Sequence, residues 1–366
     1  MSLLESLLAM AARASPSPTA KPAGPLSKPV DHRSLLDTVL SHVPHVPHAW
    51  PPLWAFLLPL LVGVVVMPWA VGRLARAGMG QKIREEGPRT HMAKGGTPTS
   101  GGLAVIGLLA LTALLLDRSP KVITPLLAIL LGGGLGLLDD LVTVKSRSWT
   151  RGLLARQRIV LQLVVGLVLA ILLLRAHADV QLVPVLGTWR MGWLLLPFAA
   201  VVLAAAANAF NLTDGSDGLA PGVMFIVALV LALMLRNYHH QAALVRLLLA
   251  TAGALGAFLV YNVPPARVFM GGVGSEGLGM MLATVAIAGG FMWFLPLLAI
   301  VPLLETASVI AQVAVFKRTG RRLFKMSPLH HHFQLSGWSE WTVALVAWAA
   351  TGLGGTIGLL LARRAA

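Results

Sequence analysis

A series of long apolar runs separated by short polar segments constrains this chain most. Two of the runs, 191–207 and 219–235, flank the segment NAFNLTDGSDGLA at residues 208–220. A membrane-spanning helix needs about 20 mostly apolar residues, and about ten candidates of this kind follow one another along the chain. They lie near 53–72, 101–117, 121–138, 158–175, 191–210, 219–236, 243–261, 277–292, 294–316 and 341–361. The sequence therefore predicts an all-α polytopic membrane protein.

The composition agrees with this class of protein. Of the 366 residues, 56% are hydrophobic and only 12% are charged, which is far outside the range of soluble globular domains. The formal net charge is +15, but basic residues concentrate in alternate loops, as they do on the cytoplasmic side of membrane proteins. We therefore expect no nucleic-acid partner. The chain has no cysteine, which excludes disulfides and thiolate chemistry.

The first 50 residues differ from the rest. Residues 15–29 are rich in Pro, Ser and Ala, so we expect residues 1–50 to form a disordered or interfacial extension and residues 51–366 to form the transmembrane domain. The loops after the first, third and ninth candidate spans carry the most Lys and Arg. They are expected on the cytoplasmic side, which puts both termini outside and residues 208–220 at the cytoplasmic face.

Residues 208–220 are the strongest candidate for a working site. Asp214 and Asp217, with the Asn211 amide, stand where the chain leaves one apolar run and enters the next. Ionisable groups at this depth are costly and usually mark function. Gly215 allows a tight turn and a close approach to a ligand. The alternative is a plain polar turn between two helices, but such a turn has no need of paired carboxylates.

Asp139 and Asp140 form a second pair of carboxylates, at the inner end of the third span. Adjacent carboxylates at a membrane edge suit divalent-cation binding or proton abstraction. An acidic helix cap is the alternative, but the C-terminus of a helix is the wrong end for negative charge. With Asp214 and Asp217, four carboxylates are available as metal ligands, and oxygen ligands favour Mg²⁺ or Mn²⁺.

Three further segments carry features of a phosphate or nucleotide site. Gly-rich residues 95–102, GGTPTSGG, follow Lys94 and precede a predicted helix, where backbone N–H groups can hold phosphate. Residues 261–276 place Phe269 near Asn262, a pairing suited to stacking on a base and hydrogen-bonding it, although core packing of Phe269 is the commoner alternative. Residues 325–340 contain three consecutive histidines. Consecutive side chains do not converge on one zinc ion, so phosphate binding fits better.

Carboxylates for a divalent cation beside basic and Gly-rich loops are typical of phosphoryl transfer, where positioning and charge neutralisation do most of the catalysis. A site at the bilayer edge indicates a lipid acceptor. A transporter is a weaker alternative, because it predicts internal repeats and polar sites at the membrane midplane. The polar segments of this chain flank the apolar runs instead.

On these residues the chain resembles the phospho-N-acetylmuramoyl-pentapeptide transferases, a family of the polyprenyl-phosphate N-acetylhexosamine-1-phosphate transferase superfamily. The resemblance runs from about Gly80 to Trp338 and rests on IREEGPRTH with GTPT, NAFNLTDGSDGLA and FKMSPLHHHF. It implies a helical bundle with a cytoplasmic-face cleft, Mg²⁺ dependence, a homodimer and a bacterial inner (plasma) membrane location. The implied reaction moves phospho-MurNAc-pentapeptide from UDP-MurNAc-pentapeptide to undecaprenyl phosphate, giving lipid I and UMP. A related enzyme that uses another UDP-N-acetylhexosamine is the nearest alternative.

The resemblance also implies roles for individual residues. Asp139 would be the base that deprotonates the lipid phosphate, supported by Asp140, and Phe269 would stack on uracil. The implied catalytic set is Asp139, Asp140, Asp214, Asp217 and His331, and the four aspartates would also ligate the metal. The implied substrate-binding set is Lys94, Thr97, Thr99, Asn211, Gly215, Asn262, Phe269, Gln312, His330 and His332.

The chain departs from the family pattern at a position that matters. Where the family has Asp in MGD-x-GS, this chain has Gly272. That aspartate is a presumed Mg²⁺ ligand and, in one proposed mechanism, the nucleophile, so a two-step route through residue 272 is excluded here. Glu276, one helical turn on, is a candidate replacement ligand. Thr143 and Ser100 are further departures, standing where Lys and Met are expected. A weakly active or inactive, ligand-binding member of the family is therefore the alternative.

Overall fold

The structure is a computed structural model that describes residues 52–76, 96–116, 120–145, 154–239 and 241–365. The predicted N-terminal extension and Lys94 lie outside these residues. The longer helices are α3 (Pro52–Arg76), α5 (Gly102–Leu116), α6 (Pro120–Lys145), α7 (Ala155–Arg175), α8 (Leu195–Thr213), α9 (Leu219–Met234), α10 (Ala242–Asn262), α11 (Gly271–Ala288), α13 (Ile300–Thr319) and α15 (Glu340–Ala365). The short elements are β1 (Val180–Val183), β2 (Gly187–Arg190), η1 (Gly192–Leu194), η2 (Leu235–His239), η3 (Met292–Phe294), α12 (Leu295–Leu298) and α14 (Leu329–Gln334).

Every predicted span contains a helix. In the described part of the chain, nine helices are long and apolar enough to cross a membrane, and α5 is a shorter apolar helix. This confirms the prediction of an all-α polytopic membrane protein. Several boundaries differ from the prediction. Helix α6 continues to Lys145 where the span was expected to end at 138, so Asp139 and Asp140 lie within the helix. The helix expected from 277 begins at Gly271, and the run 294–316 is divided at Ala299, which separates α12 from α13.

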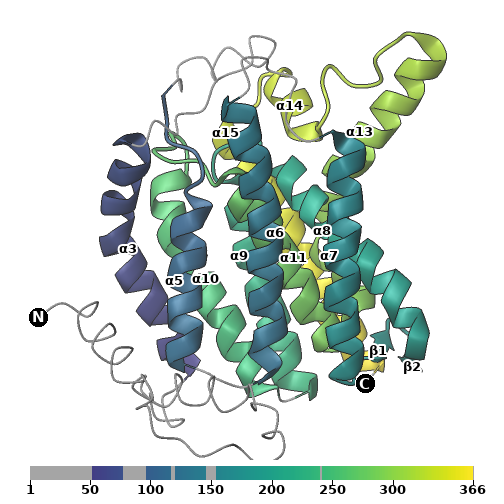
Figure 1. The fold of residues 1–366 in the computed structure, drawn as a ribbon. Coiled ribbons are helices and arrows are strands. Elements are labelled where there is room, and N and C mark those ends of the chain that lie inside the picture. The colour runs from purple at the N-terminus through teal and green to yellow at the C-terminus, as the bar shows by residue number, and fades with distance from the viewer. Residues whose placement is uncertain (1–51, 77–95, 117–119, 146–153, 240, 366) are drawn as a thin grey trace, which may run out of the picture. The chain divides into compact units, whose positions relative to one another are not determined.

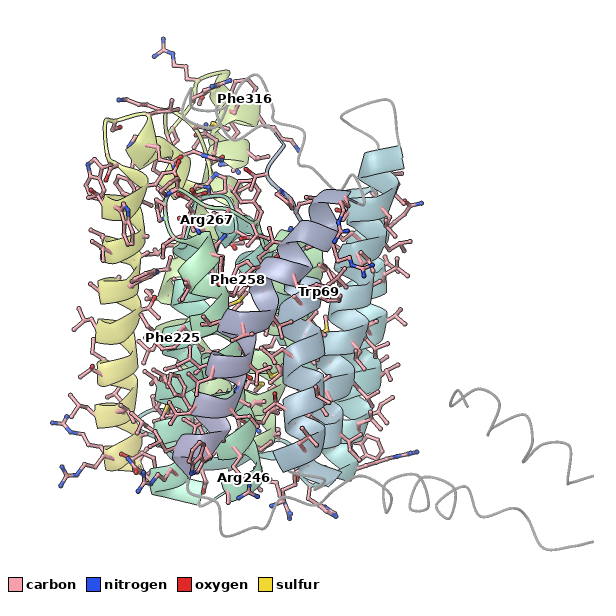
Figure 2. All side chains as sticks on the ribbon, turned by 90° about the vertical axis from the view of Figure 1, so that its left-hand side faces the viewer. Trp69, Phe225, Arg246, Phe258, Arg267 and Phe316 are labelled. Carbon is pink, nitrogen blue, oxygen red and sulfur yellow. The ribbon has the colours of Figure 1, made fainter. Side chains whose placement is uncertain are left out.

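The helices run between two ends of a bundle. One end carries α14 and the C-terminal ends of α3 and α13, and the other carries the β1–β2 hairpin and the C-terminal end of α15 (Figure 1). Figure 2 shows Arg267 near the first end and Arg246 at the second, with Phe225 and Phe258 between them. Side-chain nitrogens gather at these two ends while carbon fills the middle, as expected of a bundle that crosses a bilayer.

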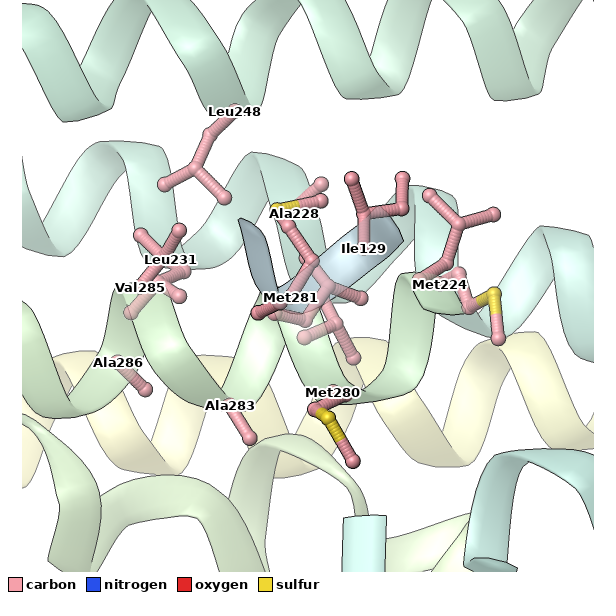
Figure 3. Close-up of a cluster of buried hydrophobic side chains, with 14 of the residues drawn as sticks. Ile129, Met224, Ala228, Leu231, Leu248, Met280, Met281, Ala283, Val285 and Ala286 are labelled. Atoms are coloured by element: carbon pink, nitrogen blue, oxygen red, sulfur yellow. The ribbon is translucent and has the colours of Figure 1, made fainter. Parts of the chain in front are cut away.

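Helix α11 forms the centre of the bundle. Almost all of its side chains are buried, and Figure 3 shows Met281 and Val285 of α11 among Ile129 of α6, Leu231 of α9 and Leu248 of α10. Apolar residues surround α11 on all sides, so it has no face toward lipid. Its N-terminus therefore lies inside the end of the bundle that carries α14.

Glycines let α11 approach α6 closely. A Cβ added at Gly136 would fall well inside contact distance of the Gly272 carbonyl oxygen, and one at Gly277 would lie 2.8 Å from the Ile129 carbonyl oxygen. Small residues are the usual means by which helices approach closely in membranes, where packing replaces the hydrophobic effect. The contact sets the start of α11 beside the C-terminal half of α6, where Asp140 lies.

The β1–β2 hairpin is not predicted from the sequence, because each strand has only four residues and the segment has the pattern of a loop. Its strands pair antiparallel, with Val183 opposite Gly187. The buried Gln181 side chain donates to the Ala178 and Ile287 carbonyl oxygens and accepts from the Met292 N–H. This one amide ties the hairpin to the C-terminal end of α11.

Replacing Gly136 by Ala is expected to destabilise the protein by about 1–3 kcal/mol, because the added methyl group collides with backbone and forces α6 away from α11. Gly134→Ala is the matched control, since nothing lies within 4 Å of a Cβ at that position. Thermal unfolding of the purified proteins in detergent measures the difference. Equal melting temperatures for the two variants would contradict the proposed contact.

Candidate active site

The N-terminus of α11 binds two carboxylates from other helices. The Asp140 carboxylate, from α6, accepts hydrogen bonds from the backbone N–H groups of Gly272 and Val273. The Asp214 carboxylate, at the C-terminal end of α8, accepts one from the N–H of Gly271. A helix N-terminus presents unpaired N–H groups and a partial positive charge, so it stabilises both anions. Two of the predicted catalytic aspartates are thereby brought together.

The Gly-rich loop before α5 lies against the same place. Ser100 donates from Oγ to Asp140 Oδ2 over 3.3 Å, and its φ of +63° is a left-handed conformation that L residues seldom adopt. The loop pairs with the segment before α11, because Phe269 N–H donates to the Pro98 carbonyl and Gly101 N–H donates to the Phe269 carbonyl. Phe269 is half-buried there. Thr97 and Thr99, also half-buried, belong to this loop.

The turn between α8 and α9 is held by the segment that follows α10. Asp217 Oδ2 accepts from the Ala266 N–H at 2.8 Å. Asn262 Oδ1 accepts from the Gly218 N–H at 3.0 Å, and its Nδ2 donates to the Val268 carbonyl at 2.8 Å. Asn262 is 2% exposed, so its amide fixes the backbone in this arrangement. Its predicted contact with uridine stays a prediction.

Helix α14 packs against the Asp214–Asp217 turn. A Cβ on Gly215 would collide with Nε2 of His330, so the absence of a side chain at 215 admits the imidazole. Gln334 Nε2 donates to Ser216 Oγ at 2.9 Å. The fully buried His330 also donates its backbone N–H to Glu305 of α13. The predicted histidine segment therefore does reach the predicted aspartate turn.

The other two histidines have different neighbours. His331 Nδ1 lies 3.2 Å from Gln334 Oε1, and His332 Nδ1 accepts from the Lys325 N–H at 3.1 Å. Gln312 of α13 accepts from the Phe324 N–H at 2.8 Å and so fixes the loop that leads to α14. His332 and Gln312 thus hold this loop, and their predicted substrate contacts remain predictions.

A buried ion pair lies beside Asp139. Arg158 of α7 pairs with Asp139 at 3.4 Å through Nη1 and with Glu276 of α11 through Nη2. Gln162 Nε2 donates to the second oxygen of Glu276 at 2.7 Å, and Asn208 donates to the Gln162 amide. Glu276 is 1% exposed, and both of its oxygens are used by protein donors. Its role as a replacement metal ligand remains a prediction that this geometry does not favour.

The electrostatics of the site favour a cation. Burial raises the pKa of Asp214 well above its ordinary value, and the nearby carboxylates of Asp140 and Asp217 raise this pKa further. In the described part of the chain, no three His, Cys, Asp or Glu side chains converge in metal-binding geometry. Metal ligation by the four predicted aspartates stays a prediction, and Asp140 with Asp214 is the pair that the N-terminus of α11 brings together.

Sequence reasoning missed several residues of this site, although most of them have a recognisable feature in the sequence. Arg158, Gln162 and Glu305 are polar residues at the start of, or within, otherwise apolar runs, and such residues usually have a partner or a function. Which partner each one has depends on how α7, α11, α13 and α14 pack. Ser275 Oγ, which donates to Asn211 Oδ1 at 3.0 Å, had no signal, because a lone serine is common in helices.

Comparison with known proteins connects this site to an enzyme family. Residues 122–290 match the family described as Glycosyl transferase family 4. Three relatives are each named phospho-N-acetylmuramoyl-pentapeptide-transferase. The protein of Moorella thermoacetica is 44% identical over 83% of this chain and 96% of its own length. Those of Heliobacterium modesticaldum and Bacillus subtilis are 40% and 38% identical, each over 85% of this chain and over 97% and 95% of their own lengths.

Replacing Glu276 by Leu is expected to destabilise the protein by about 3–5 kcal/mol, because it removes one partner of a buried ion pair. Arg190→Gln is the control, since the Arg190 side chain is 74% exposed and such a pair contributes about 0–1 kcal/mol. Melting temperatures of the two variants in detergent test this difference. A loss for Glu276→Leu no larger than that for Arg190→Gln would rule out a stabilising role for the buried pair.

The raised pKa of Asp214 predicts how the stability of the protein, measured in the presence of EDTA, depends on pH. Because its pKa is raised by folding, its contribution to stability is present below the unfolded-state pKa and is lost as the pH rises through the folded-state value. Asp214→Asn should therefore melt at a higher temperature than the wild type at neutral pH, and the gap should close near pH 4. Asp179→Asn, at the other end of the bundle, controls for a general change of charge. A gap that does not depend on pH would contradict the interpretation.

Proposed function

Because the chain belongs to the phospho-N-acetylmuramoyl-pentapeptide transferases, we propose that it transfers phospho-MurNAc-pentapeptide from UDP-MurNAc-pentapeptide to undecaprenyl phosphate, giving lipid I and UMP. The chain is a membrane-embedded transferase. The convergence of Asp140, Asp214 and the Gly-rich loop 96–102 at the N-terminus of α11 supports the substrate assignment most directly. It places anion-binding backbone and carboxylates together at one end of a membrane-spanning bundle, as phosphoryl transfer to a lipid requires.

We propose a direct displacement. An oxygen of the lipid phosphate attacks the phosphorus that carries the sugar, the new P–O bond forms, and the bond from that phosphorus to the bridging oxygen breaks. UMP leaves with the bonding electron pair. Asp139 would take the proton from the lipid phosphate, since its side chain is 23% exposed and Arg158 orients it. Gly272 has no side chain, so no covalent intermediate forms at that position.

We propose Mg²⁺ as the cofactor, with Mn²⁺ as a substitute. Asp140 and Asp214 would hold it, because their carboxylates lie close enough to raise the pKa of Asp214 and a cation relieves this repulsion. Mg²⁺ usually binds through one or two carboxylates together with substrate phosphates and water, so two carboxylates fit it. When bound, the ion neutralises negative charge on the reacting phosphates. Metal ligation by Asp139 and Asp217 remains a prediction.

The remaining substrate contacts are proposals of the same kind. Phe269 would stack on the uracil, because it is half-buried in the segment that pairs with the Gly-rich loop. His331 would contact the phosphate or sugar from α14, which packs against the Asp214–Asp217 turn. Both assignments follow the residue pattern of the family.

We propose that the α14 end of the bundle faces the cytoplasm of a bacterium, in the plasma membrane. Basic residues in the last turns of two helices support this orientation, because Lys and Arg favour the cytoplasmic side. Arg73 and Arg76 end α3, and Lys317 and Arg318 end α13, and both of these helices end on the α14 side (Figure 1). A homodimer is proposed from the family resemblance.

Release of UMP from UDP-MurNAc-pentapeptide tests the function. The purified protein in detergent, with undecaprenyl phosphate and Mg²⁺, should release UMP. EDTA should stop the release, and added Mg²⁺ should restore it. Asp139→Asn should reduce the rate at least about 100-fold, the lower range for loss of a general base. Turnover with another UDP-N-acetylhexosamine and none with this substrate would favour the related enzyme instead.

The same assay measures the effect of position 272. A Cβ added at Gly272 would lie 3.0 Å from Asp140 Oδ1, so Gly272→Asp adds a carboxylate directly beside Asp140. The wild type is expected to be active, and the variant should need less Mg²⁺ for half-maximal rate. A silent wild type with an active variant would identify this chain as a member that binds its ligands without turnover.

A further inference from the structure

The tip of the β1–β2 hairpin exposes large apolar side chains. Leu186 is 82% exposed and Val185 is 71% exposed, and Trp193 of the adjacent element η1 is 79% exposed. Val185 also has a φ of +70°, a conformation that is costly for a β-branched residue. Turns in water favour Gly, Asn and Asp at such positions. This turn therefore keeps apolar residues where neither local conformation nor water favours them.

The position of the hairpin indicates what surrounds these side chains. The hairpin follows α7, whose 21 residues span about 30 Å, the thickness of the hydrocarbon core of a bilayer. Figure 1 shows the hairpin level with the lower ends of α7 and α15, and not beyond them. Residues that begin at the end of a spanning helix and stay at its level lie in the membrane–water interface.

The surfaces next to the hairpin face lipid. Val168 and Ile171, in the last two turns of α7, are 47% and 38% exposed, and Val201 of α8 is 58% exposed. Apolar side chains with this exposure on membrane-spanning helices contact acyl chains. The apolar tip lies between these two helices in the chain, so lipid reaches up to it from both.

The residue types also match the interface. Tryptophan prefers this level of a membrane, because its ring is apolar and its N–H is polar, and Trp193 and Trp189 both belong to this region. Arg190 has a 74% exposed side chain, although its Nε lies 3.1 Å from Asp179. Such an arginine can also reach lipid phosphate, as basic side chains at membrane boundaries do.

We propose that the hairpin tip, Val185 and Leu186 together with Trp193, inserts into the lipid headgroup interface and anchors the C-terminal end of α11 at that depth. Gln181 and the Leu182 N–H tie the hairpin to the end of α11, at the carbonyl oxygens of Ile287 and Gly290. The helix that carries the carboxylate-binding site at its N-terminus is thus fixed to the bilayer at its other end. This inference is independent of the proposed function.

Site-directed spin labelling tests the insertion, and the absence of cysteine makes every label unique. Leu186→Cys is labelled with a nitroxide in the full-length protein, reconstituted into vesicles of phosphatidylethanolamine and phosphatidylglycerol. Collision rates with oxygen, which concentrates in lipid, and with a water-soluble nickel chelate give the depth of the label. Val201→Cys serves as the lipid reference and Arg321→Cys, on the exposed loop after α13, as the water reference.

The Leu186 label should collide more with oxygen and less with nickel than the Arg321 label, and its depth should fall between the two references. Adding Trp193→Ser should move this label toward the water value, because it removes an apolar anchor. A label at 186 with the oxygen and nickel accessibility of position 321 would overturn the proposal. Protection from both reagents would also overturn it, since it would mean that protein covers the tip.

Discussion

The docking of the α11 N-terminus onto two carboxylates supports the rest of this structure. A helix that starts inside an apolar bundle has several backbone N–H groups with no partner in the helix, and a carboxylate that is partly removed from water is costly without donors. Asp140 and Asp214 resolve both problems at once by accepting from residues 271–273. The close approach of Gly136 to Gly272 makes this possible, because a side chain at 136 would separate α6 from α11.

The same interaction creates a site as well as a fold. Burial raises the pKa of Asp214, and repulsion from the Asp140 carboxylate on the same helix N-terminus raises it further. One carboxylate would be enough to accept hydrogen bonds from the N-terminus of α11. A second carboxylate that repels the first does not favour stability, and such departures usually occur at functional sites. On another face of α11, Glu276 is paired with Arg158 and accepts a further hydrogen bond from Gln162. The Arg158–Glu276 pair therefore stabilises the fold, whereas the Asp140–Asp214 pair favours a bound ligand.

Much of the candidate site could be predicted from the sequence, because its members stand at the ends of apolar runs. Asp139, Asp140, Asp214 and the histidine segment all do so, and the structure brings the last three of these segments into contact with α11 or with one another. The specific partners could not be predicted. Nothing in the sequence pairs Arg158 with Glu276, which are 118 residues apart, because that contact depends on how α7 packs against α11. The hairpin was missed for a similar reason, since its stability comes from Gln181 contacting α11.

The sequence by itself determined the helical membrane class, the spans and the types of chemical group available. These follow from local properties, because about 20 apolar residues in a row have few alternatives to a spanning helix. Only the tertiary structure decided that Asp140 and Asp214 meet, that α11 starts at Gly271 and that Glu276 belongs to an ion pair. Each depends on helix–helix packing, in which single glycines set the separation of two backbones. Such contacts join residues far apart in the chain and leave no local pattern.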